Sequence, residues 1–285
     1  MPVTLHNSAQ DFLDATLGFR AVNSLTLNMI GSVATSVAQG DRTYDRYFWW
    51  VIKDETGTVV GLAMRTAPHA MVMSAMPVSA IQELVTEVVL HDDDLPEVGG
   101  PVATVDEFLR TYEETKSLGS QRKTELSHQE WLYALQELKS PVIAGEARQA
   151  TSEDFELIYK WFVAFGEEAG LFMHNTVESI QDGLKRGSLF FWLHNGEIVS
   201  LAGHAPLVDI PDAVVGRIGP VYTPLVQRKK GFAGALTAHV SQLLLNLGAQ
   251  VILYTDATNP TSNSVYQRIG FEKIGESKRV KFLEP

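Results

Sequence analysis

The feature that most constrains this chain is a pattern that occurs twice, half a chain apart. Near Trp50 and again near Trp192, a run of aromatic and aliphatic residues leads through a polar turn with glycine into a second, largely apolar run. Such a pattern predicts a β-hairpin, because Asn195-Gly196 and the longer turn at 54–57 supply the positive φ angles that tight turns need. The sequence therefore predicts the same hairpin in each half.

The elements around each hairpin also repeat in the same order. Helical patterns precede the two hairpins at 9–38 and 153–185, and helical patterns follow them at 78–90 and 231–247. This order predicts two tandem copies of one α+β unit, a first domain at 1–140 and a second at 146–285. The junction is expected at 139–145, where Ser140-Pro141 ends a helical pattern.

Composition excludes several classes of function. The chain carries 23 Lys+Arg against 34 Asp+Glu, a net charge of −11, which argues against nucleic acid as a partner. It has no cysteine, so disulfides, thiolate catalysis and cysteine-ligated metals are excluded, and no metal is expected. There is neither a leader-like segment nor a long apolar run, so we expect a cytoplasmic protein with no membrane partner.

The negative charge is unevenly distributed. Residues 1–145 hold 10 Lys+Arg and 19 Asp+Glu, whereas residues 146–285 hold 13 and 15. Within the acidic half, the His-Asp-Asp-Asp run at 91–94 is expected to be a solvated loop, and the Gly-Gly-Pro run at 99–101 is expected to be a turn. An anionic ligand is therefore expected in the near-neutral second half.

A basic segment with glycine in that second half predicts a phosphate site. A strand pattern leads to Arg228, Lys229, Lys230 and Gly231, and a helical pattern follows directly. The N-terminus of a helix offers unpaired N–H groups and the positive end of the helix dipole. Gly231 and the small Ala233 permit a pyrophosphate to approach the backbone closely. The spacings of a P-loop and of a dinucleotide fingerprint are both absent.

The same segment resembles a known family. Arg228-x-x-Gly231-x-Ala233 is similar to the Arg/Gln-x-x-Gly-x-Gly/Ala signature of the GNAT superfamily of acyl-CoA-dependent N-acyltransferases. A second signature of that superfamily follows in the right order and at a suitable separation. It consists of a buried strand at 251–256 and then Asn259, Ser262, Tyr266 and Gly270-Phe271. The resemblance covers residues 147–285.

The resemblance implies a fold and an activity. Each unit would be a central mixed, mostly antiparallel sheet flanked by helices, an α+β or α/β architecture. The activity would be N-acetyltransfer from acetyl-CoA, a co-substrate, to the primary amine of a small molecule or peptide. That amine would attack the thioester directly in a ternary complex.

The resemblance also assigns site residues. The pyrophosphate of CoA would bind the loop of Arg228, Lys229, Lys230, Gly231, Phe232 and Ala233. A bulge near Val221, Tyr222 and Thr223 would splay two parallel strands, and its N–H groups would bind the pantetheine arm and the thioester carbonyl. Asn259, Ser262 and Asn263 would contact CoA or cap the next helix. Tyr266 would lie near the sulfur and protonate the leaving thiolate.

Two positions depart from the family pattern. Many members carry a glutamate base on the strand before the loop, and residues 216–221 contain none. His204 is the best substitute by residue type, because imidazole titrates near neutral pH; a structural histidine is the competing interpretation. Asp209, Glu168, His174 or a chain of waters are weaker alternatives. Lys229 replaces a common glycine, which is acceptable if that residue has ordinary backbone dihedrals.

The first copy lacks the loop. Its third predicted strand, at 70–76, passes through Pro77 straight into a helix, with no Arg-x-x-Gly. The first unit is therefore predicted not to bind CoA, and to shape the acceptor site or stabilise the second unit. A catalytically inactive CoA sensor or interaction module is the alternative function. The identity of the amine and the oligomeric state are left open.

Overall fold

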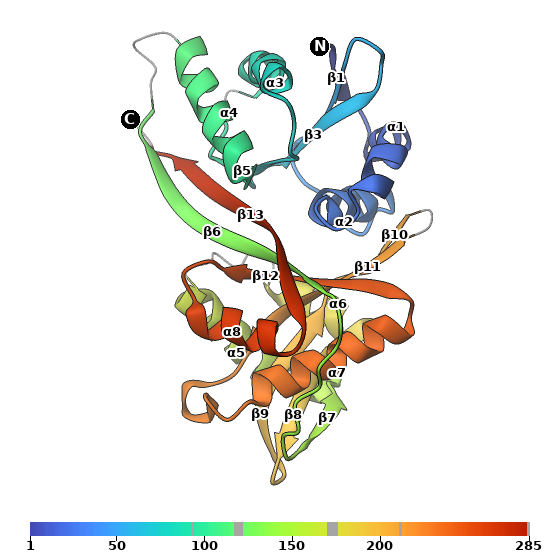
Figure 1. The fold of residues 1–285 in the computed structure, drawn as a ribbon, viewed down its shortest axis with the longest axis vertical. Coiled ribbons are helices and arrows are strands. Elements are labelled where there is room, and N and C mark those ends of the chain that lie inside the picture. Colours follow the sequence, from blue (N-terminus) through green and yellow to red (C-terminus); the bar gives the residue numbers. More distant parts are fainter. Residues whose placement is uncertain (93, 117–121, 170–175, 211–212, 284–285) are drawn as a thin grey trace.

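The computed structural model describes residues 1–285 except 93, 117–121, 170–175, 211–212 and 284–285. In this described part, one mixed sheet of 13 strands runs along the molecule, and eight α-helices cover it (Figure 1). No helix in the described ranges is long and apolar enough to cross a membrane.

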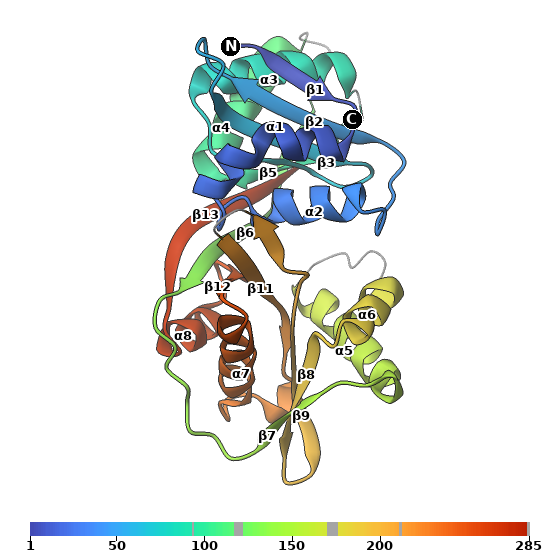
Figure 2. The ribbon, with the colours of Figure 1, turned by 90° about the vertical axis from the view of Figure 1, so that its right-hand side faces the viewer.

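The first half forms five neighbouring strands in chain order. They are β1 (Val3–His6), β2 (Tyr47–Lys53), β3 (Val59–Thr66), β4 (Met71–Met73) and β5 (Glu97–Pro101). The neighbours are antiparallel except β4 and β5, which are parallel. Helices α1 (Ala9–Val22) and α2 (Asn28–Ala38) pack on one face, and α3 (Val78–His91) and α4 (Val102–Thr115) on the other (Figure 2).

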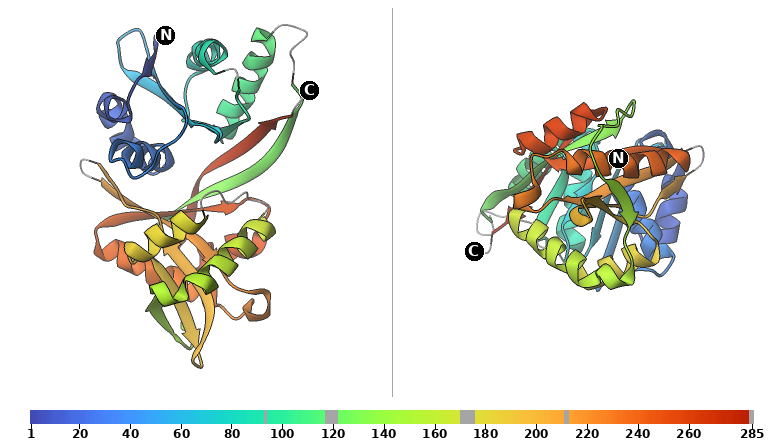
Figure 3. Two further views of the ribbon diagram at one scale, coloured as in Figure 1. Left: turned by 180° about the vertical axis from the view of Figure 1, so that it is seen from behind. Right: turned by 90° about the horizontal axis from the view of Figure 1, so that it is seen from below.

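The second half repeats this plan. Its strands are β7 (Glu146–Gln149), β8 (Leu189–His194), β9 (Glu197–His204), β11 (Ala213–Tyr222) and β12 (Ala249–Asp256), and β10 (Val208–Ile210) pairs with β11. The last pair, β11 and β12, is again parallel. Helices α5 (Phe155–Ala169) and α6 (Thr176–Lys185) lie on one face, and α7 (Phe232–Asn246) and α8 (Pro260–Arg268) on the other (Figures 2 and 3). The predicted repeat of hairpins and helices is confirmed.

The two halves are joined by a ribbon of two long strands, β6 (Thr124–Leu135) and β13 (Phe271–Phe282), which we call the β6–β13 ribbon. Strand β6 lies between β12 and β13, and β13 lies between β5 and β6. The sheet thus crosses the expected junction, and the division into domains at 1–140 and 146–285 stays a prediction. The expected helical pattern before Ser140 is wrong, because this stretch pairs as strand β6 on both of its edges.

Two expectations for the acidic half are also wrong. Residues 99–101 lie in strand β5, where they pair with β13, and do not form a turn. Asp92 is not solvated: it is fully buried at the end of α3 and forms an ion pair with Arg65 of β3, whose side chain is 1% exposed. Nη2 of Arg65 also donates to the carbonyl oxygen of Asp94 at 2.8 Å. A charge run therefore contributes one carboxylate to the core of the first half.

The buried ion pair generates a prediction. Replacing Asp92 with alanine would leave the buried Arg65 guanidinium with only the exposed carboxylate of Asp94, 4.0 Å away, as a counter-charge, which costs about 3 kcal/mol of unfolding free energy. Urea denaturation followed by circular dichroism measures the loss. Glu55→Ala, at an exposed hairpin turn, is the control and should change stability by less than about 0.5 kcal/mol. Equal effects for the two variants would contradict the structural role of Asp92.

Candidate functional site

The candidate site is centred on the point where strands β11 and β12 part. They pair in parallel from Val214 opposite Ala249 to Ile218 opposite Leu253, and the pairing ends there. On the other edge of β11, the register with β9 shifts between Ile218 and Val221, so a bulge bends β11 away from β12. The bulge lies just before the predicted position, Val221 to Thr223. Because Pro220 within it has no N–H, its neighbours in the chain must supply any backbone donors.

The loop after β11 presents a set of free backbone donors. The chain passes through a short 3₁₀ helix, Leu225–Gln227, and α7 begins at Phe232 with Gly231 as its N-cap. The backbone N–H groups of residues 229–234 form no hydrogen bond with any residue that the structure describes. Unpaired N–H groups at the positive end of a helix form an anion site.

Gly231 is required by the backbone geometry of this loop. Its φ angle is 87°, in the left-handed region that favours glycine. A Cβ atom at this position would lie 2.7 Å from Cδ1 of Ile143, in the segment that connects the two halves. Lys229 also has a positive φ, 63°. The condition of ordinary dihedrals at Lys229 is therefore not met, and this lysine occupies a conformation typical of the glycine it replaces.

The side chain of Arg228 is held next to the bulge. Its Nε donates to the carbonyl oxygen of Thr223 at 2.8 Å, and Nη2 pairs with the carboxylate of Glu168 on α5. The hydroxyl of Tyr222 donates to the same carboxylate at 3.1 Å, and burial together with Glu168 raises the pKa of Tyr222. Ser200 on β9 donates to the carbonyl oxygen of Tyr222 at 3.1 Å. The sequence names Glu168 only as a weak candidate base, because a pair this distant along the chain leaves no local pattern.

The second predicted segment forms the start of α8. Asn259 is the N-cap, and its side chain accepts from the backbone N–H of Ser262 at 3.1 Å. Asn263 is buried: its Nδ2 donates to the carbonyl oxygen of Asp256 at 3.3 Å, and its Oδ1 has no partner within the described ranges. The capping role proposed for this segment is thus seen for Asn259, and contact with CoA stays a prediction.

Tyr266 of α8 lies in the core that α7 and α8 share. It packs in one cluster with Leu236 of α7 and with Phe271. Val265 is close enough to α7 that a Cβ on Gly234 would lie 3.4 Å from its Cγ1, so α8 packs against the first turn of α7. Burial raises the pKa of Tyr266 to about 12, so its hydroxyl keeps its proton at neutral pH. The role of Tyr266 as proton donor stays a prediction.

The other candidates for the base are dispersed. His204 ends β9 opposite Ile218, and strand alternation places it on the face that α7 covers, with Ala202 and Ile218. Its Nδ1 donates to the carbonyl oxygen of Ala205 at 2.9 Å, and burial lowers its pKa, which favours neutral imidazole. Asp209 is exposed on β10, and His174 lies outside the described residues. The role of His204 as base stays a prediction.

The residues present fit a CoA pyrophosphate. The free N–H groups at 229–234, the glycine at the N-cap and the cations of Lys229 and Lys230 provide donors and positive charge where a diphosphate needs both, beside Arg228 in its pair with Glu168. Among the residues described, no three His, Asp or Glu side chains are grouped in a way that could hold a metal ion.

Comparison with known proteins gives consistent results. Residues 209–280 match the model of the family described as FR47-like protein. No curated protein sequence matches the chain. A GNAT-family acetyltransferase from Colwellia psychrerythraea has a similar structure, with a TM-score of 0.60 and 12% identity, over 99% of both chains. A GCN5-related N-acetyltransferase from Sphaerobacter thermophilus gives 0.62 and 17%, over 99% of this chain and 96% of its own.

A tandem GNAT protein from the clavulanic acid biosynthesis pathway also has a similar structure, with a TM-score of 0.57 and 11% identity, over 100% of this chain and 99% of its own. These three structural similarities extend over both halves of the chain. The family model matches only residues of the second half, and the matched residues include β11 and β12, the loop before α7, and α8. The fold expected from the resemblance is thereby confirmed: the chain has the fold of these GNAT structures, repeated in its two halves.

Proposed function

We propose that the protein is an N-acetyltransferase that transfers the acetyl group of acetyl-CoA to a primary amine by direct attack in a ternary complex. The observation that carries this proposal is the row of free N–H groups at the start of α7, placed directly after the parting of β11 and β12. The GNAT fold supports acyl-CoA-dependent acetyl transfer in general. Cations at 228–230 supply the charge that the diphosphate of this co-substrate needs.

The chemistry follows from this placement. The amine nitrogen forms a bond to the thioester carbon, and the carbon–sulfur bond breaks. Backbone N–H groups of the β11 bulge stabilise the negative charge that develops on the carbonyl oxygen. Tyr266 donates its proton to the thiolate, and the amine gives a proton to a base, for which His204 is one candidate. Binding both reactants in one site supplies the orientation that a bimolecular step lacks.

A CoA-binding sensor is the second candidate, since β11 carries no carboxylate that could serve as base. The two functions differ in one observable, the release of free thiol from acetyl-CoA when an amine is present. In both cases we propose that the CoA site belongs to the second half. The β4–α3 connection of the first half, at 74–77, contains neither glycine nor a cation. We propose that the first half instead helps to form the site for the acceptor amine.

The loop geometry predicts the effect of Gly231→Ala. The added Cβ would meet Ile143, and the left-handed φ would be strained, so the free N–H groups would be displaced. We expect the Kd for acetyl-CoA to rise by about tenfold or more, measured by isothermal titration calorimetry. Gly18→Ala, in a helix with open space around it, is the matched control and should leave the Kd unchanged. An unchanged Kd in Gly231→Ala would refute the placement of the diphosphate.

The buried hydroxyl of Tyr266 predicts a change in kcat without a change in binding. Tyr266→Phe keeps the ring in its core, so we expect kcat to fall by about 100-fold while KM for acetyl-CoA stays within about twofold. Because the pKa of Tyr266 lies near 12, its proton is lost only as the pH rises through that value. Its titration should therefore produce no loss of wild-type kcat below about pH 10. Exposed Tyr159→Phe is the control, and unchanged turnover in Tyr266→Phe would remove this residue from the mechanism.

A further inference from the structure

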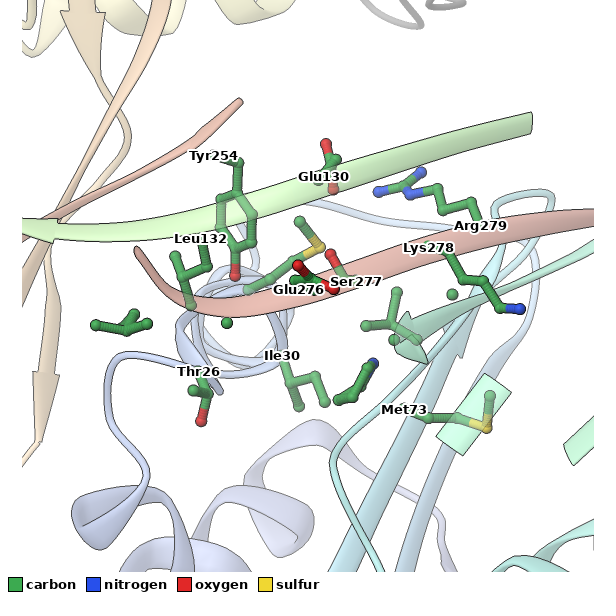
Figure 4. Close-up of a pocket in the computed structure, with 17 residues that line it drawn as sticks. Thr26, Ile30, Met73, Glu130, Leu132, Tyr254, Glu276, Ser277, Lys278 and Arg279 are labelled. Atoms are coloured by element: carbon green, nitrogen blue, oxygen red, sulfur yellow. The ribbon is translucent and has the colours of Figure 1, made fainter. Parts of the chain in front are cut away.

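A cavity lies between the first half and the β6–β13 ribbon (Figure 4). Its volume is about 290 Å³, and α2, β4 and β5 of the first half form the wall opposite the ribbon. Tyr254, which also lines it, is the first residue of β12 beyond the last pair with β11, Ile218 and Leu253. The cavity therefore borders the place where the strands part, and where the proposed function puts the thioester.

One face of the ribbon supplies the polar wall of this cavity. On β6, Glu130 and His128 share a face, because side chains two residues apart in a strand point to the same side. On β13, Ser277 is paired with Glu130, and Arg279 is paired with His128. Figure 4 shows the guanidinium of Arg279 directed toward Glu130. Both residues line the cavity, and they come from different halves of the chain.

Glu130 is held as a carboxylate. Burial raises its pKa, but the hydrogen bond from His128 and the charges of Arg279, His128 and Arg217 outweigh burial, so the net pKa is lowered. Nε2 of His128 lies 3.4 Å from Oε1 of Glu130, and this contact raises the pKa of His128, which favours its charged form. The negative charge of the wall is therefore fixed at Glu130.

Positive charge exceeds negative charge around this carboxylate. Arg279 and Arg217, whose charges both act on Glu130, form no hydrogen bond through their side chains and no ion pair with any described residue. The charge of Arg42 also acts on Arg217, whereas three further charged groups near the wall are already engaged. Lys278 pairs with Asp106, Glu276 pairs with Lys273, and the carboxylate of Asp256 accepts from Thr258. One carboxylate, already in contact with His128, thus faces two further arginines, which leaves a place for an anionic group from outside.

Tyr254 supplies a further donor to this place. Its hydroxyl accepts from Nδ2 of Asn28 on α2 at 3.1 Å, so its own proton remains available within the described part of the chain. Burial raises the pKa of Tyr254, so the hydroxyl stays protonated. Apolar side chains in the rest of the wall include Ile30 and Met73 from the first half and Leu132 from β6, beside the polar Thr26 and Ser277.

We propose that this cavity is the acceptor site and that it takes a small amino acid with an apolar side chain. The α-carboxylate would bind Arg279 and the hydroxyl of Tyr254, the amino group would bind Glu130, and the side chain would pack against Ile30, Met73 and Leu132. The inference rests on the proposed acetyl transfer, and it names the class of acceptor. The volume is at the lower end of the range that holds small ligands, which favours a free amino acid over a peptide.

The test compares three probes that carry the same isobutyl group. L-Leucine has both charged groups, isoamylamine lacks the carboxylate, and 4-methylpentanoate lacks the amine. Thiol release from acetyl-CoA is measured with the two amines, and inhibition of leucine turnover is measured with the acid. We expect kcat/KM for leucine to exceed that for isoamylamine by about tenfold or more, because isoamylamine lacks the carboxylate that would contact Arg279 and Tyr254. The acid should inhibit competitively with leucine.

Three charge-removing variants locate the effect. Arg279→Met should lower kcat/KM for leucine by about tenfold or more, change that for isoamylamine by less than about threefold, and abolish inhibition by the acid. Lys281→Met removes a positive charge from an exposed position on the same strand, and should preserve the preference for leucine. Glu130→Gln should raise KM for both amines and leave inhibition by the acid in place.

The outcomes separate this inference from the proposed function. Absence of acetyl-CoA binding would overturn the proposed function, and calorimetric titration of leucine into wild type and Arg279→Met would still decide whether the cavity binds an amino acid. If acetyl-CoA binds, equal use of leucine and isoamylamine, or a preference unchanged in Arg279→Met, would overturn the inference. Acetyl-CoA binding with neither turnover nor binding of leucine would overturn it as well.

Discussion

The pairing of β6 with β13 is the constraint on which the rest of the structure depends. Each of these strands completes the sheet of the half to which it does not belong in sequence: β6 covers the edge of β12, and β13 covers the edge of β5. Without them, two parallel pairs, β4–β5 and β11–β12, would each end in an uncovered edge with unpaired N–H and C=O groups. Neither half therefore completes its hydrogen bonding alone, and the two repeats form one sheet.

The ribbon also determines where the polar groups of the molecule meet. It runs from β5, the last strand of the first half, to β12, beside the point where β11 and β12 part. One of its faces carries side chains from both halves. The backbone of the loop before α7 is supplied by the second half alone, whereas Glu130 comes from the first half and Arg279 from the second. The diphosphate site is thus local in sequence, and the cavity beside it is assembled from distant segments.

This difference explains what the sequence could predict. The hairpins, the helices that flank them and the loop at 228–233 are local patterns, fixed by side-chain periodicity, turn residues and glycine positions, and the structure has them where they were expected. The helical pattern expected before Ser140 is the exception, because that stretch is strand β6. The ribbon is different, because Glu130 pairs with Ser277 and no local pattern encodes so distant a partner. The same reason hides the burial of Asp92 and the pairing of Arg228 with Glu168. The backbone angle of Lys229 could not be predicted for another reason: a lysine in the sequence does not reveal that its φ is positive.

The repeated plan gives the first half a role that needs no cofactor loop. Its parallel pair β4–β5 occupies the position that β11–β12 occupy in the second half, but the four residues at 74–77 lead directly into α3 without glycine or cations. What remains at this place is apolar surface, Met73 of β4 and the adjacent Ile30 of α2, facing the ribbon. On the proposed function, a degenerate copy is therefore well suited to hold the apolar part of an acceptor, while the second copy holds the anionic co-substrate.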